Sequence, residues 1–544
     1  MEIIPVLIAG GGPVGLTLAH ELARRGVRSA LVERNHDTTR HPKMDITNGR
    51  SMELFRMAGL AEKLRAAGVP QENVFDVAWV TTMTGHELHR FRYRSAAEGR
   101  ETILKINDGS QSREPPMRAS QIDIEPVLKR AAQSQPLLHA RFGVELEDLS
   151  QDADGVTAMV RDRDSNKAET LRCRYLVGCD GGGSRLRDAI GIQQSGQARV
   201  MPRFMTHFLS DDRQLLQRWG VTWHYQSNVG TLIAQDDRNT WTLQSRGPAL
   251  EGQDLDPATL LRNFAGRDFA HKILVANPWW PHLLVADTYG AGRVLLAGDA
   301  AHQYIPTGGY GMNTGIGDAF DLAWKLAAVV LGFGGEELIR SYQIERRPVG
   351  LRNREGSRRH SEVRVEIAQV YAAHGEALRA AGESGAAARA AAGAEIATIG
   401  NAENECFGLE FGYCYADSPI VAPEPDTPVP TDPLRYEVTA RPGARLPSVF
   451  LSDGTALYDR LGPWFTLVSF GRDTGGFVQA AESLGLPLAV LALNEPDLAP
   501  IYGAKLLLVR PDQHVAWRGD AALEAAAARD IVAMAVGRRG GVNA

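Results

Sequence analysis

Three glycines near the start of the chain, Gly10, Gly12 and Gly15, have the spacing of a loop that holds the phosphates of a dinucleotide. Gly10 permits a tight turn, Gly12 lets the backbone approach a pyrophosphate, and Gly15 lets the next helix pack closely on a sheet. The N–H groups and the positive dipole end of that helix would face the phosphates. Glu33 ends the second predicted strand, where a carboxylate accepts hydrogen bonds from a ribose diol. Tight turns use the same glycines for structure alone, but strand, helix and acid in register predict a dinucleotide site.

Two later motifs each place an aspartate at the end of a predicted strand. Residues 180–187 have the form D-G-x-x-S-x-x-R, and Gly298 and Asp299 precede a glycine-rich turn at residues 306–313. A strand-end aspartate can hold a polyol hydroxyl, and a glycine turn at a helix start exposes N–H groups that suit a reduced, anionic ring. Each motif alone could be a capped helix start. In this order and spacing, the three motifs together strongly favour one shared nucleotide site.

The elements that must position these motifs predict a fold of α/β (α+β) class. Each motif follows a short apolar stretch that is predicted to be a strand, and apolar residues at helical spacing follow the first motif. Two other stretches alternate apolar and polar side chains, as antiparallel strands do. We therefore predict a Rossmann-like domain made of residues 1–75, 107–190 and 286–400, interleaved with an antiparallel-sheet domain made of residues 76–106 and 191–285.

The end of the chain predicts a separate closing domain. Residues 401–440 are rich in proline and indicate an extended linker. Residues 441–544 predict strands and helices in the order β-α-β-β-β-α, which resembles a thioredoxin fold. This part contains no cysteine, so thiol chemistry is excluded there and a structural or oligomerisation role is expected.

Composition narrows the class of protein. With 544 residues, 44% of them hydrophobic, the chain can bury a large core. A net charge of −6 and a pI of about 6.2 imply no basic surface for nucleic acid. The four cysteines form no C-x-x-C, so neither a disulfide framework nor a metal site is expected. With no leader and no apolar run long enough to span a membrane, we expect a cytoplasmic protein.

The three motifs resemble those of the class A flavoprotein aromatic hydroxylases, over residues 3 to about 350. Residues 342–348 are similar to the family's Y-x-x-E-R-R-P, and residues 441–447 to the P-G-x-R-x-P of its phenol hydroxylase and polyketide hydroxylase branch. The resemblance implies FAD as the dinucleotide, with a small aromatic substrate. The FAD-binding residues that it implies are Gly10, Gly12, Pro13, Gly15, Glu33, Arg34, Lys43, Arg50, Gln121, Asp180, Arg187, Asp299, Pro306, Gly309, Gly311, Met312 and Asn313.

The same resemblance implies a reaction in two halves. Hydride from NADPH or NADH reduces the flavin, which then takes up O₂ as a C4a-hydroperoxide that attacks an electron-rich ring. Deprotonating a phenol enriches the ring, and the resemblance assigns the base to Asp45 and places Pro306 beside the reacting edge of the flavin. His224 and Tyr225 lie on one predicted strand with opposite orientations, so one of them would face the substrate.

Other interpretations of the sequence stay open. A Baeyer–Villiger or epoxidising enzyme acting on a polyketide would keep the flavin, and a non-catalytic relative would bind a small molecule without turnover. Asp45 could be only a loop residue that caps a helix, and His224 only a hydrogen-bonded part of the sheet. A homodimer is expected from the terminal domain, whereas nucleic acid and membrane are not expected as partners.

Overall fold

Residues 3–247, 250 and 255–538 are described by a computed structural model of the chain. Its largest sheet contains β1 (Ile4–Ala9) at the centre, paired in parallel with β2 (Ser29–Glu33) and β10 (Ala168–Gly178). β10 continues to β19 (Val294–Leu296), and β2 to β7 (Leu138–Phe142). Because these strands are all parallel, the three sequence motifs leave the sheet at the same carboxyl edge.

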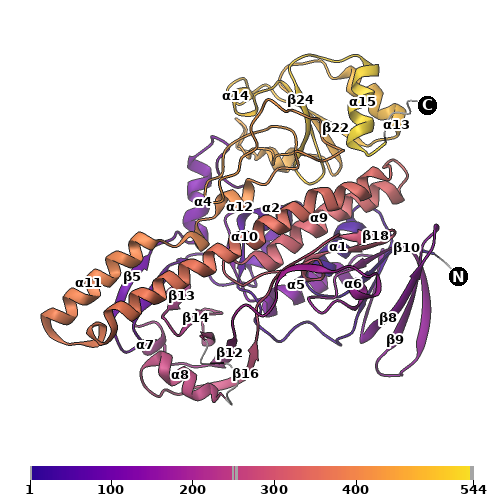
Figure 1. Cartoon of the computed structure of the whole chain (residues 1–544). Helices are drawn as coiled ribbons and strands as arrows, with labels where there is room; N and C mark the ends of the chain where they lie inside the picture. The colour runs from indigo at the N-terminus through magenta and orange to yellow at the C-terminus, as the bar shows by residue number, and fades with distance from the viewer. Residues whose placement is uncertain (1–2, 248–249, 251–254, 539–544) are drawn as a thin grey trace.

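Two helices that follow the motifs pack against each other beside this sheet. They are α1 (Pro13–Arg24) and α9 (Tyr310–Val330), which run side by side beneath α10 in Figure 1. Nearly every residue of α9 is buried, in keeping with its apolar composition. The N-termini of both helices therefore lie at the edge where the motifs meet.

A second sheet forms the lower part of the molecule in Figure 1. Its strand order is β16 (Lys272–Trp279), β12 (Arg203–Leu209), β15 (Thr240–Arg246), β14 (Gly230–Ala234), β13 (His224–Gln226), β4 (Val77–Val80) and β5 (Glu87–Phe91). All neighbours are antiparallel except β13 and β4. The alternation predicted from the sequence thus produces a largely antiparallel sheet.

The two faces of this sheet differ in chemistry. One face packs Phe208, Tyr225 and Trp241 against α8 (Pro257–Ala265). The other face, which we call the polar face, carries side chains such as His224, Gln226, Thr231, Thr242 and Gln244. Part of the polar face is covered by α10 (Glu337–His374), a helix of 38 residues.

The C-terminal domain has the predicted thioredoxin-like order. Its four-stranded sheet runs β22 (Leu488–Ala492), β21 (Phe465–Ser469), β23 (Leu506–Val509) and β24 (Val515–Gly519), with α13 (Gly475–Leu484) and α15 (Ala525–Ala535) packed together. The domain sits above α9 and α10 in Figure 1, and Phe465 meets Trp324 of α9 edge to face. The predicted fold class, with its three kinds of domain, is confirmed.

Two segments differ in detail from the strands and linker predicted for them. Residues 96–105 form a helix, α4 (Ala96–Lys105), where we predicted strand, because Ser95 and Glu98 make a reciprocal capping box that starts a helix. The segment 401–440 is largely irregular, yet its Phe411, Tyr413 and Ile420 are buried. It also contains a short helix, α12 (Phe407–Phe411), that packs on the FAD-binding side of the molecule.

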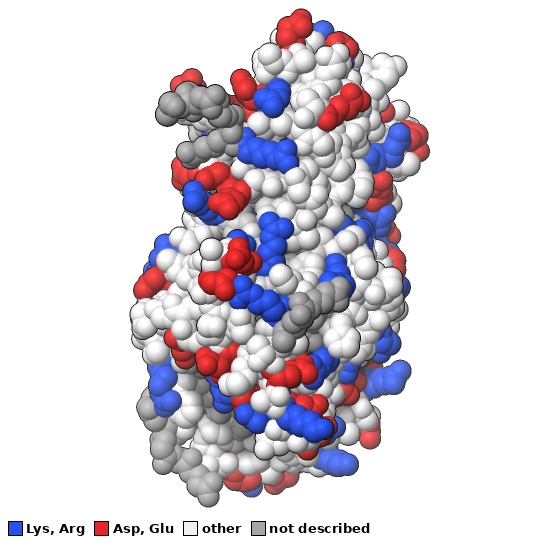
Figure 2. Space-filling view, turned by 90° about the vertical axis from the view of Figure 1, so that its right-hand side faces the viewer, with Lys and Arg blue, Asp and Glu red and all other residues white. Residues whose placement is uncertain are grey.

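The molecular surface carries charges of both signs. On the face shown in Figure 2, acidic and basic side chains are interspersed. No helix among the described residues is long and apolar enough to cross a membrane. The regions of the molecule differ mainly in the charged side chains that are buried inside them.

Candidate active site

The first glycine loop has a shape that only glycine permits at two positions. Gly10 has a φ of +114°, and a Cβ there would lie 2.2 Å from the carbonyl oxygen of Cys179. A Cβ on Gly15 would lie 2.0 Å from the carbonyl oxygen of Gly10. At Gly12, by contrast, nothing lies within 4 Å of the added Cβ, and α1 begins with Pro13 at its first turn and no side-chain cap. The loop is therefore closed on the protein side and open on the ligand side.

Glu33 is held beside this loop. Its Oε2 accepts a hydrogen bond of 2.6 Å from the Gly11 N–H, and its Oε1 accepts one of 2.8 Å from the Asn35 N–H. The carboxylate is thus fixed at the strand end where a ribose would lie. Arg34 next to it is exposed, and only its carbonyl is engaged, by Arg163.

The second motif contains a buried polar atom without a partner. Asp180 accepts a hydrogen bond from the Leu186 N–H through Oδ2, whereas its Oδ1 is buried and unpaired. Burial raises the pKa of this carboxyl. Arg187 donates to the carbonyls of Gly182 and Ala300, which ties the second motif to the third. Asp299, in that third motif, is exposed at the edge of the sheet.

The N-terminus of α9 completes this edge. Gly309 precedes the helix with a φ of +68°, and no side chain caps the helix. A Cβ on Gly311 would meet only Asp299, at 4.0 Å, so the first turn is open on that side. Met312 is buried, and Pro306 is exposed in the loop that enters the helix. The unpaired N–H groups of this turn can bind a negatively polarised ring edge.

Two further predicted residues lie near the start of α5 (Gln121–Gln133). Gln121 is buried, and its amide donates to Glu125 at 2.6 Å. Its backbone N–H donates to the carbonyl of Met44, which brings residues 43–45 to the same place. Lys43 is exposed there.

Asn313 ties the segment that carries Asp45 to α9. Its side-chain amide donates to the carbonyl of Ile46 at 3.1 Å, and its oxygen accepts from the Asn48 N–H at 3.0 Å. Ile46 also packs on Gly309, where a Cβ would come within 2.3 Å of its Cγ2. Asp45 is therefore positioned next to the loop and helix start that contain Pro306 and Gly309.

Asp45 meets two side chains from the substrate sheet. The indole N–H of Trp223 donates a short hydrogen bond to its Oδ2, and Nε2 of His224 lies 3.5 Å from the same oxygen. Burial acts to raise the pKa of Asp45, but His224 and then Arg118 outweigh it and lower the pKa below its ordinary value. Burial lowers the pKa of His224, which outweighs the pull of Asp45. The pair is thus a carboxylate beside a neutral imidazole.

Two predicted site residues point elsewhere. Tyr225 lies in the apolar face of the sheet, and its hydroxyl donates to the carbonyl of Gly220 at 2.6 Å, so the structure gives it a packing role instead of the predicted catalytic one. The guanidinium of Arg50 donates to Gln513 and to the carbonyl of Asp512 in the C-terminal domain. Arg50 is therefore committed to an interdomain contact, and not to the cofactor edge where we predicted it.

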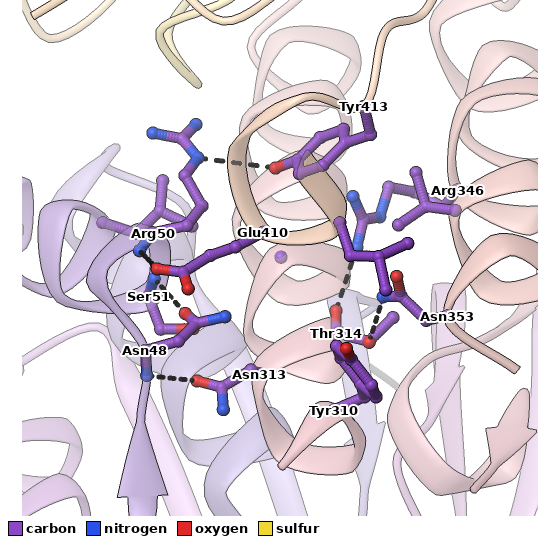
Figure 3. A pocket seen from close by; sticks show the side chains of 14 residues that line it. Asn48, Arg50, Ser51, Tyr310, Asn313, Thr314, Arg346, Asn353, Glu410 and Tyr413 are labelled. Carbon is purple, nitrogen blue, oxygen red and sulfur yellow. Dashed lines mark hydrogen bonds between the residues drawn. The ribbon is translucent and has the colours of Figure 1, made fainter. Parts of the chain in front are cut away.

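The small pocket in Figure 3 lies beside α9 and next to Arg50. Its volume of about 30 Å³ holds one or two waters, so it is too small for an aromatic substrate. Figure 3 shows the Asn48–Asn313 hydrogen bond at its lower edge and Glu410 above it. The Oε1 of Glu410 accepts a hydrogen bond from the Arg50 N–H at the start of α2 (Gly49–Met57). The residues around this pocket therefore help to hold the segment that contains Asp45 in place.

The sequence interpretation missed two side chains of this corner. Neither Trp223 nor Arg118 was assigned to the site from the sequence. Arg118 lies over the Trp223 ring at 5.8 Å and acts on Asp45 electrostatically. The position of Trp223 directly before His224 was the only available signal, since the contact joins residues that lie far apart in the chain.

Comparison with known proteins agrees with this architecture. Residues 4–357 match the family model described as FAD binding domain, and residues 439–538 match that described as aromatic-ring hydroxylase, C-terminal. The chain belongs to the FAD-dependent aromatic-ring hydroxylases. It is therefore a flavoprotein monooxygenase.

Individual relatives of this monooxygenase cover almost its whole length. It is 35% identical to the FAD-dependent monooxygenase apdD of Emericella nidulans over 98% of this chain and 90% of the relative. It is 31% identical to a putative polyketide hydroxylase of Streptomyces halstedii, over 95% and 93% of the two chains. The rebeccamycin biosynthetic enzyme RebC with reduced flavin superposes with a TM-score of 0.87 at 34% identity, over 98% of this chain and 99% of RebC.

The residues of this monooxygenase fit FAD. The open side of Gly12 and the uncapped start of α1 suit the pyrophosphate. The unpaired Oδ1 of Asp180 and the exposed Asp299 provide acceptors for hydroxyl groups. The uncapped start of α9 provides donors for the ring, and Glu33 provides an acceptor for the ribose. The pyrophosphate, the hydroxyl groups and the flavin ring of the cofactor thus each have a matching group at the same sheet edge.

Proposed function

We propose that this monooxygenase hydroxylates a phenolic or polycyclic aromatic substrate with O₂ and NADPH or NADH. The observation that carries the proposal is the position of Asp45, which is tied to the α9 start by Asn313 and contacted by His224 of the substrate sheet. A ring on the polar face of the sheet would lie between these residues and the cofactor edge. FAD, once reduced by the nicotinamide, supplies the electrophilic oxygen for this chemistry.

Asp45 and His224 are proposed to take up the phenolic proton. An ionised aspartate of low pKa is a weak base alone, but it fixes and polarises the neutral imidazole beside it. His224 accepts the proton at Nδ1, which has no partner among the described residues, while its Nε2–H faces Asp45. The resulting phenolate directs electron density to its ortho and para carbons. Trp223 holds the carboxylate in place through its indole N–H.

Replacement of Asp45 by asparagine tests the proposal. Asp45→Asn keeps the acceptor for Trp223 but removes the charge, so we expect product formation to fall by about a hundredfold or more. FAD content and thermal stability should stay as in the wild type. The measurement is substrate-stimulated NADPH oxidation over a panel of phenols, together with the product structure by mass spectrometry and NMR.

The control for this test is Asp256→Asn, because Asp256 is an exposed helix cap at the start of α8, on the apolar side of the substrate sheet. A hydroxylation rate that Asp45→Asn leaves unchanged would refute the assignment. A product with oxygen inserted into a carbon–carbon bond would show Baeyer–Villiger chemistry instead. We also propose a homodimer, which light scattering of the purified protein would test.

A further inference from the structure

Two arginines lie directly opposite each other on the polar face of the substrate sheet. Arg203 of β12 pairs in register with Arg246 of β15, so their side chains leave the sheet on the same side. Burial lowers the pKa of both arginines, and the positive charge of Arg364 in α10 lowers it further. Like charges in opposite positions destabilise a sheet, most of all where water is largely excluded.

One carboxylate is available to these three cations. Glu403 accepts hydrogen bonds of 3.0 and 2.9 Å from Arg364 and is thereby occupied. Among the described residues, Arg203 donates only to the sulfur of Met201, and Arg246 only to the carbonyls of Ser227 and Gly230. In the described part of the chain, neither of the two opposed arginines therefore forms an ion pair with a carboxylate.

Polar atoms around the arginine pair are also left without partners. The same face carries buried, unpaired Oε1 of Gln226, Oγ1 of Thr231 and Nε1 of Trp79. Trp79 lies next to Arg246, whose guanidinium carbon is 5.8 Å from the ring centre. Buried donors and acceptors without partners cost free energy, so a site that has several of them is suited to a polar ligand.

We propose that Arg203 and Arg246 bind a carboxylate of the aromatic substrate, at the end of the sheet face away from Asp45. The planar guanidinium fork matches the geometry of a carboxylate, and the pair supplies two forks. Thr242, which lies in register with His224 through Ile233, is roughly 14 Å along β15 from Arg246. That span favours a fused polycyclic acid over an acid with one ring. The inference rests on the proposed function for the position of the reacting ring.

The test compares an acid with its neutral analogue. The FAD-loaded enzyme is titrated with a hydroxyanthraquinone carboxylic acid and with its methyl ester, and binding is followed by the flavin absorption spectrum and by tryptophan fluorescence. We expect the acid to bind at least tenfold more tightly than the ester. Arg203→Met should abolish this preference and leave the affinity for the ester unchanged, and Arg246→Met should do the same.

A matched control is Arg262→Met, since Arg262 is exposed on α8 at the other face of the sheet. It should keep the wild-type preference. Arg203→Met should not lower the melting temperature of the ligand-free enzyme, because it removes one contact with a thioether and relieves a repulsion. A fall in that temperature would indicate a structural arginine and would overturn the proposal.

Two other results would overturn the proposal. Equal affinity of the wild type for acid and ester would show that no carboxylate site exists. A raised KM for NADPH in Arg203→Met, with the acid preference intact, would place the nicotinamide phosphates there instead. Since the preference is measured by binding, it can hold even if no phenol is hydroxylated, and the two proposals fail separately.

Discussion

Buried cations occur in two regions of this monooxygenase, and the two regions treat them differently. Between α9, α10 and the C-terminal domain, Lys325 and Arg510 are surrounded by carboxylates, and we call this group the docking network. On the polar face of the substrate sheet, Arg203 and Arg246 form no ion pair with any carboxylate that the structure describes. The same kind of side chain thus joins two domains in one region, where it is fully buried, and is proposed to bind a ligand in the other, where Arg203 is 9% exposed and Arg246 is half-buried.

The docking network pairs two cations with three carboxyls. Arg510 donates to Asp321, Glu345 and Asp512, and Lys325 donates to the first two. Burial raises the pKa of Asp321 well above its ordinary value, although Lys325 and Arg510 oppose this shift. Burial would also raise the pKa of Glu345, but Arg510 and Lys325 lower it to about 2. The two cations occupy the space that a metal ion would need among the three carboxyls.

A second contact between the same domains uses the motif at residues 441–447. Arg445 of that motif donates to both oxygens of Glu53 in α2, and Arg50 donates to Glu53 as well. The motif therefore holds the C-terminal domain to the helix that follows Asp45. A structural arginine in this molecule is therefore recognised by the carboxylates that pair with it, whereas a candidate binding arginine lacks such a pair.

The largest expected effect follows from breaking the docking network. Arg510→Met leaves Glu345 and Asp512 without their principal cation, and removing one partner of a buried pair costs about 3–5 kcal/mol. We expect a large fall in the melting temperature of the FAD-loaded enzyme. Arg358→Met, which removes an exposed helix pair, should change it little. If Arg203→Met were as destabilising as Arg510→Met, the distinction between the two regions would fail.

The next effect concerns Glu410, the buried carboxyl above the pocket in Figure 3. Burial raises its pKa from an ordinary 4.5 to about 7. The folded state then binds more protons than the unfolded state between these values, so the free energy of unfolding falls by about 3 kcal/mol as pH rises through this window. Glu410→Gln keeps an acceptor for the Arg50 N–H and removes this dependence.

Denaturant unfolding at pH 5 and pH 8 measures the effect of this change. We expect Glu410→Gln to match the wild type at the lower pH and to be more stable at the higher one. Glu376→Gln, at an exposed position, should follow the wild type at both. An equal offset at both pH values would mean that Glu410 is ionised throughout.

The turns on the cofactor side of this molecule could be predicted from the sequence, because each of them is local. The turns at Gly10, Asp180 and Gly309 are each built from consecutive residues, so their chemistry can be recognised from short motifs. Parallel strands then bring the three turns to one edge without further information. The order of strands and helices in the thioredoxin-like domain could also be predicted, since each element has its own hydrophobic period.

The substrate side could not be predicted in the same way. Which face of a strand points inward depends on register, and a one-residue shift exchanges His224 with Tyr225. The opposition of Arg203 and Arg246 likewise depends on the pairing of β12 with β15. Arg50 was assigned to the cofactor by resemblance to the family, but its side chain donates to carbonyl and amide oxygens more than four hundred residues later in the chain.

The smallest expected effect concerns Asp45, the carboxylate that lies beside His224. Trp223→Phe removes the indole donor, which helps to lower the pKa of this carboxyl. A single hydrogen bond to a charged group is worth about 1.5–3 kcal/mol at most, so we expect the acidic limb of the kcat–pH profile to move to higher pH by about one unit.

The control for this variant is Trp241→Phe, which removes a comparable indole hydrogen bond, to the carbonyl of Ser210, on the apolar face of the same sheet. It should leave the limb in place, because that face has no contact with Asp45. Equal movement of the limb in both variants would mean that the profile reports the stability of the sheet, and Asp45 would then lose its assignment as part of the proton acceptor.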